Sequence, residues 1–184
     1  MLNKDKKRAY DKIRNENNKE ERKLRAKEYY KNNKQKYIDR NRKLSNIKYK
    51  NNPSFKLRNR LTCEVGKSLK NIGSSKKGHS ILEYLPYTIQ ELKIYLENLF
   101  KLPGNEWMNW NNWKKYNAKT WVDGDESTYT WNIDHIIPQS DLPHTSMEDE
   151  NFKLCWSLNN LRPYSAKQNI IDGSTKIRHK INNS

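Results

Sequence analysis

Cysteine is scarce in this chain of 184 residues, which contains only Cys63 and Cys155. The two cysteines stand 92 positions apart and form no Cys-x-x-Cys pair. This spacing excludes a zinc ribbon or a zinc knuckle, because those sites need pairs of ligands a few residues apart. One disulfide between the two would be feasible, but nothing in the sequence indicates it.

Apolar residues are also few, at 33% of the chain, and the mean hydropathy is −1.23. The longest strongly apolar stretch, around Ile94–Phe100, is far too short to span a bilayer. No apolar run follows the first charged residues, so the N-terminus does not have the pattern of a signal peptide. The sequence therefore predicts an intracellular protein without a membrane partner, whose core does not extend through the whole chain.

Positive charge is abundant and unevenly distributed. The chain has 37 Lys and Arg against 21 Asp and Glu, a formal net charge of +16. Residues 1–80 hold 26 basic and 8 acidic side chains, whereas residues 81–184 hold 11 and 13. A block of excess positive charge of this kind is typical of an arm that binds a polyanion.

The first part of that block has no residue that breaks a helix, because glycine and proline are absent before Pro53. Large apolar residues are too sparse in it to form a buried face. We therefore predict a basic helical or partly disordered DNA-binding arm over residues 1–52. The alternative is a disordered tail that only keeps the chain soluble.

Residues 53–104 are predicted to form a small helical segment. Pro53 followed by a serine is typical of a helix start. Apolar residues then recur at helical spacing from Phe55 to Leu69, with basic residues on the other faces. This pattern predicts a basic amphipathic helix that ends near Ile72–Gly73.

A second helix is predicted in the same segment. Thr88 and Glu91 have the spacing of a capping box, in which each side chain bonds the backbone N–H near the other. Leucines and a phenylalanine follow at helical spacing, and we expect Pro103–Gly104 to end the helix.

Tryptophan is concentrated in one stretch, since five of the six fall between residues 107 and 131. A small domain needs bulky residues to form any core, so we interpret these tryptophans as packing residues. The alternative is that they stack on bases or insert between them.

The last part of the chain, residues 105–184, is predicted to contain a strand, a loop, a second strand and a helix. The stretch Thr128–Ile133 alternates and is rich in β-branched and aromatic residues, which is typical of a strand. Pro163 is expected to open a short helix, because proline is favoured in the first turn. Gly173 is expected to end that helix.

Three short motifs follow one another in this region: Asp134-His135-Ile-Ile-Pro, Asn160-Leu-Arg-Pro, and Lys167-x-Asn169 ahead of a glycine. In this order and spacing they resemble the HNH endonucleases, the ββα-metal nuclease superfamily that includes homing endonucleases and the colicin DNases. The resemblance covers roughly residues 131–176. It implies an α+β fold in which a C-terminal ββα-metal (HNH) nuclease domain follows a basic helical N-terminal region.

The resemblance also implies a role for each motif residue. Asp134 and Asn169 would supply oxygen ligands to a divalent metal, Mg²⁺ first and Mn²⁺ or another divalent ion as alternatives. His135 would take a proton from the attacking water, as histidine does near neutral pH. Asn160 would bond backbone across the loop and hold the strand of His135, with Asn159 as an alternative if the register differs by one residue.

Some positions depart from the family pattern. A histidine is common at the position of Asn132, and a lysine is common near Asp172. We interpret Asp172 as a helix cap, with an extra metal ligand as the alternative. Three histidines have no partner at metal-ligand spacing and are interpreted as surface residues: His79, His144 and His179.

Six basic residues are candidates for contacts with DNA phosphates, and ordinary surface charge is the alternative for each. Those near the motifs are Arg162, Lys167 and Lys176, and those in the first amphipathic helix are Arg58, Arg60 and Lys67.

The function that these features predict is a metal-dependent DNA endonuclease acting on double-stranded DNA, in a phage or homing-endonuclease setting. One alternative is a non-catalytic nucleic-acid-binding protein with a degenerate HNH fold. The other is a structure-specific or RNA nuclease. The sequence leaves open whether the protein is a monomer or a dimer.

Overall fold

The computed structural model describes residues 4–175, and contacts between Cα atoms divide the chain into two units, residues 1–51 and 52–184. The first unit contains α1 (Lys4–Asn17) and α2 (Lys19–Asn51). Neither helix buries a residue. The helical form predicted for the arm is thus present, and its role in binding DNA stays a prediction.

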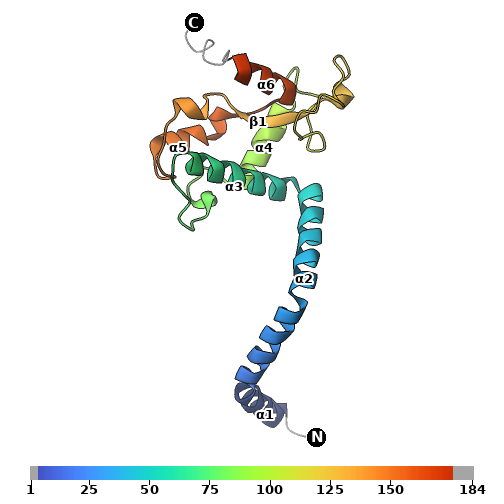
Figure 1. The fold of residues 1–184 in the computed structure, drawn as a ribbon, viewed down its shortest axis with the longest axis vertical. Coiled ribbons are helices and arrows are strands. Elements are labelled where there is room, and N and C mark those ends of the chain that lie inside the picture. The colour runs from blue at the N-terminus through green and yellow to red at the C-terminus, as the bar shows by residue number, and fades with distance from the viewer. Residues whose placement is uncertain (1–3, 176–184) are drawn as a thin grey trace. The chain divides into compact units, whose positions relative to one another are not determined.

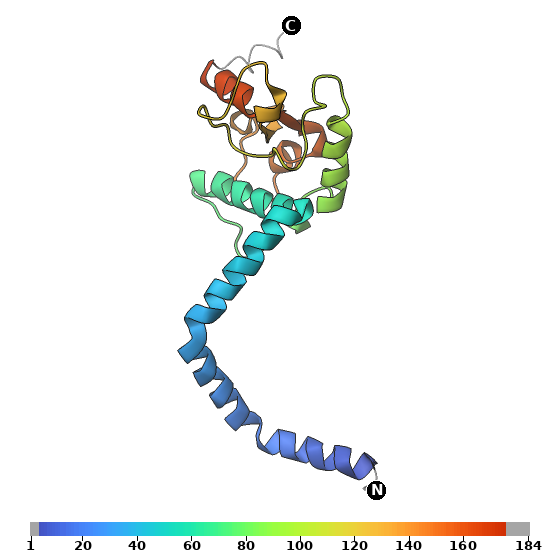
Figure 2. The ribbon, with the colours of Figure 1, turned by 90° about the vertical axis from the view of Figure 1, so that its right-hand side faces the viewer.

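Local pairs of side chains are the visible stabilising contacts of this first unit. The helices α1 and α2 are separate ribbons in Figure 2, and Asn18 lies between them in the sequence. The Asn18 side-chain nitrogen donates to the Arg14 carbonyl at 2.9 Å. Arg25 pairs with Glu21 one turn earlier on α2. Exposed pairs of this kind contribute only about 0.3–0.5 kcal/mol each.

The second unit begins with α3 (Pro53–Asn71), whose ends follow the predicted signals. The Asn52 side chain accepts a hydrogen bond from the Phe55 N–H at 3.0 Å and so caps the helix. After the helix, Gly73 has a φ of 73°, which a residue with a β-carbon rarely adopts. Four side chains at helical spacing are fully or almost fully buried: Leu57, Leu61, Val65 and Leu69.

The helix α4 (Ile89–Leu99) begins with the predicted capping box. Thr88 and Glu91 each accept a hydrogen bond from the other's backbone N–H. The predicted end was wrong by four residues, because the helix stops at Leu99 and turns precede Pro103. The Asn105 side chain donates to the Leu99 carbonyl at 3.0 Å, which satisfies a helix-end acceptor there.

A two-stranded antiparallel hairpin carries the motif residues. It consists of β1 (Trp131–His135) and β2 (Leu161–Ser165) and is followed directly by α6 (Ala166–Thr175). The strand predicted from Thr128 starts three residues later, because residues 126–128 form a 3-10 turn capped by Asp125. The fold is a mixture of helices and one small antiparallel sheet, which agrees with the predicted α+β class.

The helix start predicted at Pro163 was wrong, because Pro163 lies in the middle of β2, opposite Ile133. A proline φ near −65° suits an extended strand as well as a helix start, and proline disfavours a helical residue before it. The helix begins instead after Ser165, whose hydroxyl accepts from the Gln168 N–H at 3.3 Å. Gly173 lies within α6 and does not end it.

The hairpin lies between helices in the second unit. The helix α6 contacts both strands, α4 contacts β2, and α3 packs on α4 (Figure 1). The short helix α5 (Glu150–Cys155) lies in the connection between the two strands. Single-turn 3-10 helices occur in other connections, at Ile81–Glu83, Gln139–Asp141 and Leu158–Asn160.

The tryptophans form an aromatic core beside the hairpin. Trp131 is fully buried and stacks on Trp113, with ring centroids 5.5 Å apart, and Phe100 meets its edge. Trp113 also forms an isolated β-bridge with Trp131. Packing is therefore the role of these two residues, as the sequence predicted.

The predicted boundary near residue 104 does not coincide with a boundary between compact units. Leucines of α3 and α4 share one core with Trp131 and Leu161 of the hairpin. Residues 52–184 therefore form one unit, because α3 and α4 bury their apolar faces against the same core as the strands.

The two cysteines are free thiols in different environments. Cys63 is exposed on α3, whereas Cys155 is fully buried, and burial raises the pKa of the Cys155 thiol to about 12. We expect one thiol per chain to react with a thiol reagent at pH 8, and two after unfolding in guanidinium chloride, because the thiolate is the nucleophile. Two fast thiols in the native protein, counted by absorbance, would contradict this packing of Cys155.

Within residues 4–175, no helix is both long enough and apolar enough to cross a membrane.

Candidate functional site

One pocket of about 320 Å³ brings together three of the four predicted catalytic and metal-binding residues, together with Arg60. Asp134 and His135 line it from the end of β1, and Asn169 lines it from α6. Successive side chains of a strand point to opposite faces, so Asp134 and His135 flank the strand end. The helix α3 contributes a wall of Arg60, Leu61 and Glu64. Arg60 was predicted as a phosphate contact, but the position of α3 beside the motif residues was not predicted from the sequence.

Asp134 is buried and ion-paired. Its exposed fraction is 3%, and its Oδ2 accepts from Arg162 Nε at 3.1 Å. The two residues face each other in the register of the hairpin. A buried carboxylate needs a paired cation or several hydrogen bonds to remain charged. Arg162 is therefore the cation that the hairpin register places beside the Asp134 carboxylate.

Arg162 belongs to a chain of contacts that reaches α6. Its guanidinium lies over the Tyr164 ring, 4.1 Å from the centroid, and the Tyr164 hydroxyl donates to Asp172 at 2.7 Å. Burial, and then this bond to Asp172, raise the pKa of the Tyr164 phenol, which keeps it a donor. Gln168 donates to the other Asp172 oxygen at 2.6 Å.

This geometry corrects the interpretation of Asp172 as a helix cap. Asp172 is buried inside α6, and its carboxylate binds side chains of Tyr164 and Gln168. Through Tyr164, Asp172 connects α6 to β2, so these contacts give it a structural role.

His135 packs edge-on against a buried tryptophan. The His135 and Trp156 ring centroids are 4.7 Å apart and the ring planes are nearly perpendicular, at 84°. Trp156 also lines the pocket and is 1% exposed. The tryptophan therefore fixes one side of the imidazole while the ring borders the pocket.

Asn160 clamps the loop that leaves β1. Its Oδ1 accepts from the Ile137 N–H at 2.7 Å, and its Nδ2 donates to the carbonyls of Ile137 and Cys155 at 3.1 and 2.9 Å. Its backbone carbonyl accepts from the Ile136 N–H. Asn160 is 5% exposed, whereas Asn159 is exposed, so the cross-loop bonds are made by Asn160.

The amides of Asn169 and Asn132 also line the pocket. Both residues are half-buried. The Oδ1 of Asn132 is buried without a hydrogen-bond partner among residues 4–175. An unsatisfied buried oxygen is costly, so Asn132 Oδ1 is an acceptor that a ligand in this pocket would engage.

The donor set of this pocket fits a hard divalent cation. Asp134 offers a carboxylate and Asn169 an amide oxygen, and oxygen ligands are those that Mg²⁺ prefers. Two protein ligands suit Mg²⁺, which keeps several waters and takes further oxygens from a substrate phosphate. Within the described part of the chain, no group of three or more His, Cys, Asp and Glu side chains is placed to hold a metal.

The six predicted phosphate-binding residues are not brought together. Arg162 is paired with Asp134, Lys167 with Asp123, and Lys67 with Glu64. Arg60 lines the pocket, whereas Arg58 borders two other hollows on the surface. Lys176 lies outside the described residues.

The interpretation of His144 as a surface residue was wrong. His144 is 8% exposed, with Nδ1 2.9 Å from the Leu142 carbonyl and Nε2 3.3 Å from the Ser68 hydroxyl. It ties the loop after β1 to α3, a contact between distant segments that no local pattern predicts. His79 is exposed, as predicted, and His179 lies outside the described residues.

No family model, curated protein sequence or solved structure matches this chain.

Proposed function

We propose that this protein is a metal-dependent DNA endonuclease of the HNH type. The observation that carries the proposal is the shared pocket, in which Asp134 and His135 of a β-hairpin meet Asn169 of the helix that follows it. The order strand, strand, helix is that of the ββα-metal nucleases that the motifs resemble.

Hydrolysis of a phosphodiester needs an activated water, stabilisation of the charge on the phosphate, and help for the leaving oxygen. Bound by Asp134 and Asn169, a divalent metal would supply the charge stabilisation. His135, at the edge of the same pocket, is the residue that can accept the proton of the attacking water. Its contact with Trp156 restricts the orientation of the ring, which supports this role.

Asn160 and Arg162 would act as positioning residues. Asn160 bonds the backbone two residues beyond His135 and so fixes where the strand of that histidine ends. Arg162 holds the Asp134 carboxylate through the ion pair across the hairpin. Neither role requires contact with the substrate.

A non-catalytic DNA- or RNA-binding protein is the second candidate. The observation that favours it is the ion pair itself, because Arg162 already neutralises the proposed metal ligand Asp134. A binding protein with a degenerate nuclease fold would keep such a pair for stability alone.

A plasmid-cleavage assay separates the two candidates. We expect the full chain to convert supercoiled DNA to nicked or linear product in Mg²⁺ but not in EDTA. His135→Ala should lower the rate by at least about 100-fold, the scale of general acid–base catalysis, without weakening DNA binding. The exposed His79 provides the control, since His79→Ala should cleave at the wild-type rate.

The same assay with other nucleic acids tests the substrate. Branched DNA and RNA of the same sequence should be cleaved more slowly than duplex DNA. Faster cleavage of either would make the protein a structure-specific or RNA nuclease with the same site. Wild-type cleavage by His135→Ala would remove that residue from the mechanism, and tight binding without cleavage of any substrate would favour the binding protein.

A further inference from the structure

The helix α3 contributes charged side chains to the pocket that contains the motif residues. Arg60 and Glu64 of α3 line the pocket together with Trp113 and Lys115 of the loop before β1. We call these four residues the α3 wall. None of them belongs to the three sequence motifs, and they are separated from His135 by 20 residues or more along the chain.

The wall carries positive charge that the protein does not neutralise. Among residues 4–175, neither Arg60 nor Lys115 forms an ion pair with an acidic side chain, and Glu64 is paired with Lys67 at 3.0 Å. The basic residues closest to the motifs differ in this respect, since Arg162 is paired with Asp134. The wall is therefore the side of the pocket where cations remain available to an anion.

Trp113 lies beside two cations of α3, Arg60 and Lys56. The Arg60 guanidinium lies 5.4 Å from the centroid of the Trp113 ring, and the Lys56 ammonium lies 4.5 Å from it. Lys56 Nζ also donates to the Trp113 carbonyl at 2.8 Å. Because Trp113 is itself 2% exposed and stacked on Trp131, the aromatic core holds this arrangement in place.

Crowding of like charges is unfavourable unless an anion joins them. Burial lowers the pKa of Lys56, and the neighbouring charges of Arg60 and Lys114 lower it further. A phosphate beside Arg60 would relieve part of this repulsion, and Arg is the residue best suited to bind two phosphate oxygens at once.

We infer that the α3 wall binds the backbone of the nucleic acid strand that is cut, with Arg60 and Lys115 holding a phosphate next to the scissile one. This inference rests on the proposed function and adds to it the surface that positions the strand. The ligand is a phosphodiester chain held through its phosphates, so the wall does not read the base sequence.

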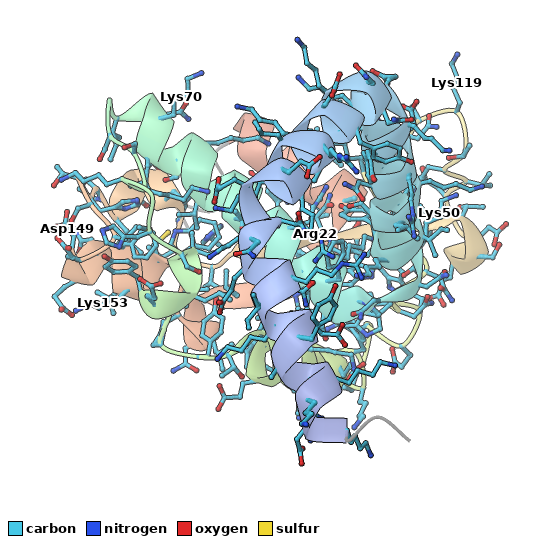
Figure 3. The ribbon with its side chains drawn as sticks, turned by 90° about the horizontal axis from the view of Figure 1, so that it is seen from below. Arg22, Lys50, Lys70, Lys119, Asp149 and Lys153 are labelled. Carbon is cyan, nitrogen blue, oxygen red and sulfur yellow. The ribbon has the colours of Figure 1, made fainter. Side chains whose placement is uncertain are left out.

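A charge-matched pair of variants tests the wall. Arg60→Gln/Lys115→Ala removes its two available cations. Lys70→Ala/Lys119→Ala removes one cation from the same helix and one from the same loop, and both of these side chains are exposed and extend away from the protein (Figure 3). The two double variants have equal net charge, so a difference between them reports position and not total charge.

Binding is measured first, by fluorescence anisotropy of a labelled 20-mer DNA duplex in EDTA with the full chain. The wall variant should bind about tenfold more weakly and show a log–log salt slope shallower by about 2, because each lost phosphate contact removes close to one released counterion. The control variant should lose much less affinity. Equal losses in the two variants would overturn the inference.

Cleavage is measured next, at saturating enzyme in Mg²⁺. The wall variant should cut at least about tenfold more slowly even when all DNA is bound, since a misplaced phosphate reacts slowly. Arg60→Lys should recover part of this rate, whereas a purely structural role of Arg60 would instead lower the melting temperature of every Arg60 variant equally.

The outcomes separate this inference from the proposed function. Normal cleavage by the wall variant would overturn the inference and leave the nuclease in place. If no variant and no wild-type protein cleaves, but the wall variant alone binds weakly, the wall is supported and the nuclease is not. An RNA 20-mer of the same sequence, run in parallel, identifies which phosphodiester chain the wall prefers.

Discussion

Asn160→Ala is expected to be the most destabilising single substitution of a polar residue in the second unit. It removes three side-chain hydrogen bonds, one to the Ile137 N–H and two to the carbonyls of Ile137 and Cys155. Unsatisfied buried groups cost about 1–3 kcal/mol each, so we expect the free energy of unfolding to fall by about 3 kcal/mol or more. Urea denaturation followed by tryptophan fluorescence measures this change.

Asn159→Ala is the matched control for this substitution. Asn159 is the neighbouring residue of the same type but is exposed, so its loss should change the free energy of unfolding by less than about 0.5 kcal/mol. Asn160→Asp should also be destabilising, because it sets an oxygen against the Ile137 and Cys155 carbonyls. Near-equal unfolding midpoints for the two alanine variants would show that the clamp does not hold the loop.

We expect Asn160→Ala to lower the rate of DNA cleavage as well as the stability of the fold. Asn160→Ala frees the loop directly after His135, so we expect the cutting rate to fall even at temperatures where the variant remains folded. A folded Asn160→Ala protein with the wild-type rate would restrict Asn160 to a role in stability.

Removal of the arm is expected to have the largest effect on DNA binding. Residues 1–51 hold 19 Lys and Arg against 7 Asp and Glu, which leaves 18 against 14 in residues 52–184. If the arm makes ~8 phosphate contacts, its contribution to the log–log salt slope is near −7. A chain that starts at Asn52 should therefore bind at least about 100-fold more weakly in 0.1 M salt, with a slope near that of the α3 wall alone.

The structure fixes where this truncation should be made. Asn52 caps α3 through the Phe55 N–H, so a cut after residue 52 would remove the cap and cost about 1 kcal/mol. A cut after Asn51 keeps the cap, and the truncated chain should show the same melting temperature as the second unit of the full protein. Equal affinity of the truncated and full chains would contradict the role of the arm, whatever the fate of the nuclease proposal.

Local signals in the sequence were enough to predict the two helices of residues 53–104. The start of α3 at Pro53 and the capping box of Thr88 and Glu91 satisfy orphan N–H groups within one turn, so they depend on no distant contact. The cross-loop bonds of Asn160 were expected from the motifs and are present. Its proposed part in catalysis is a separate matter that the cleavage assays address.

The parts that could not be predicted depend on contacts between distant segments. The ion pair of Arg162 with Asp134 follows from the register of the hairpin, and no residue near Arg162 in the sequence specifies that register. Burial of His144 depends on Ser68, which lies 76 positions earlier. The α3 wall likewise exists only because α3 and the Trp113 loop pack around the same aromatic core.

The sequence around Pro163 is compatible with either a helix start or a strand, and the reason is physical. Its fixed φ is compatible with the first turn of a helix and with an extended strand, and only the pairing of Pro163 with Ile133 decides between them. The local order of strand and helix was predicted correctly, while the exact start of α6 was not.

Because α1 and α2 bury no side chains, we expect their helix content to depend on temperature. A helix without tertiary contacts owes its formation to backbone hydrogen bonds and local pairs, and it melts gradually on warming. Under the proposed function, we therefore expect the arm to meet DNA as a partly helical segment whose helical fraction falls on heating. Completing the helix on the nucleic acid would release heat and lose entropy. We therefore expect the proposed affinity for DNA to fall as temperature rises, even while the second unit remains fully folded.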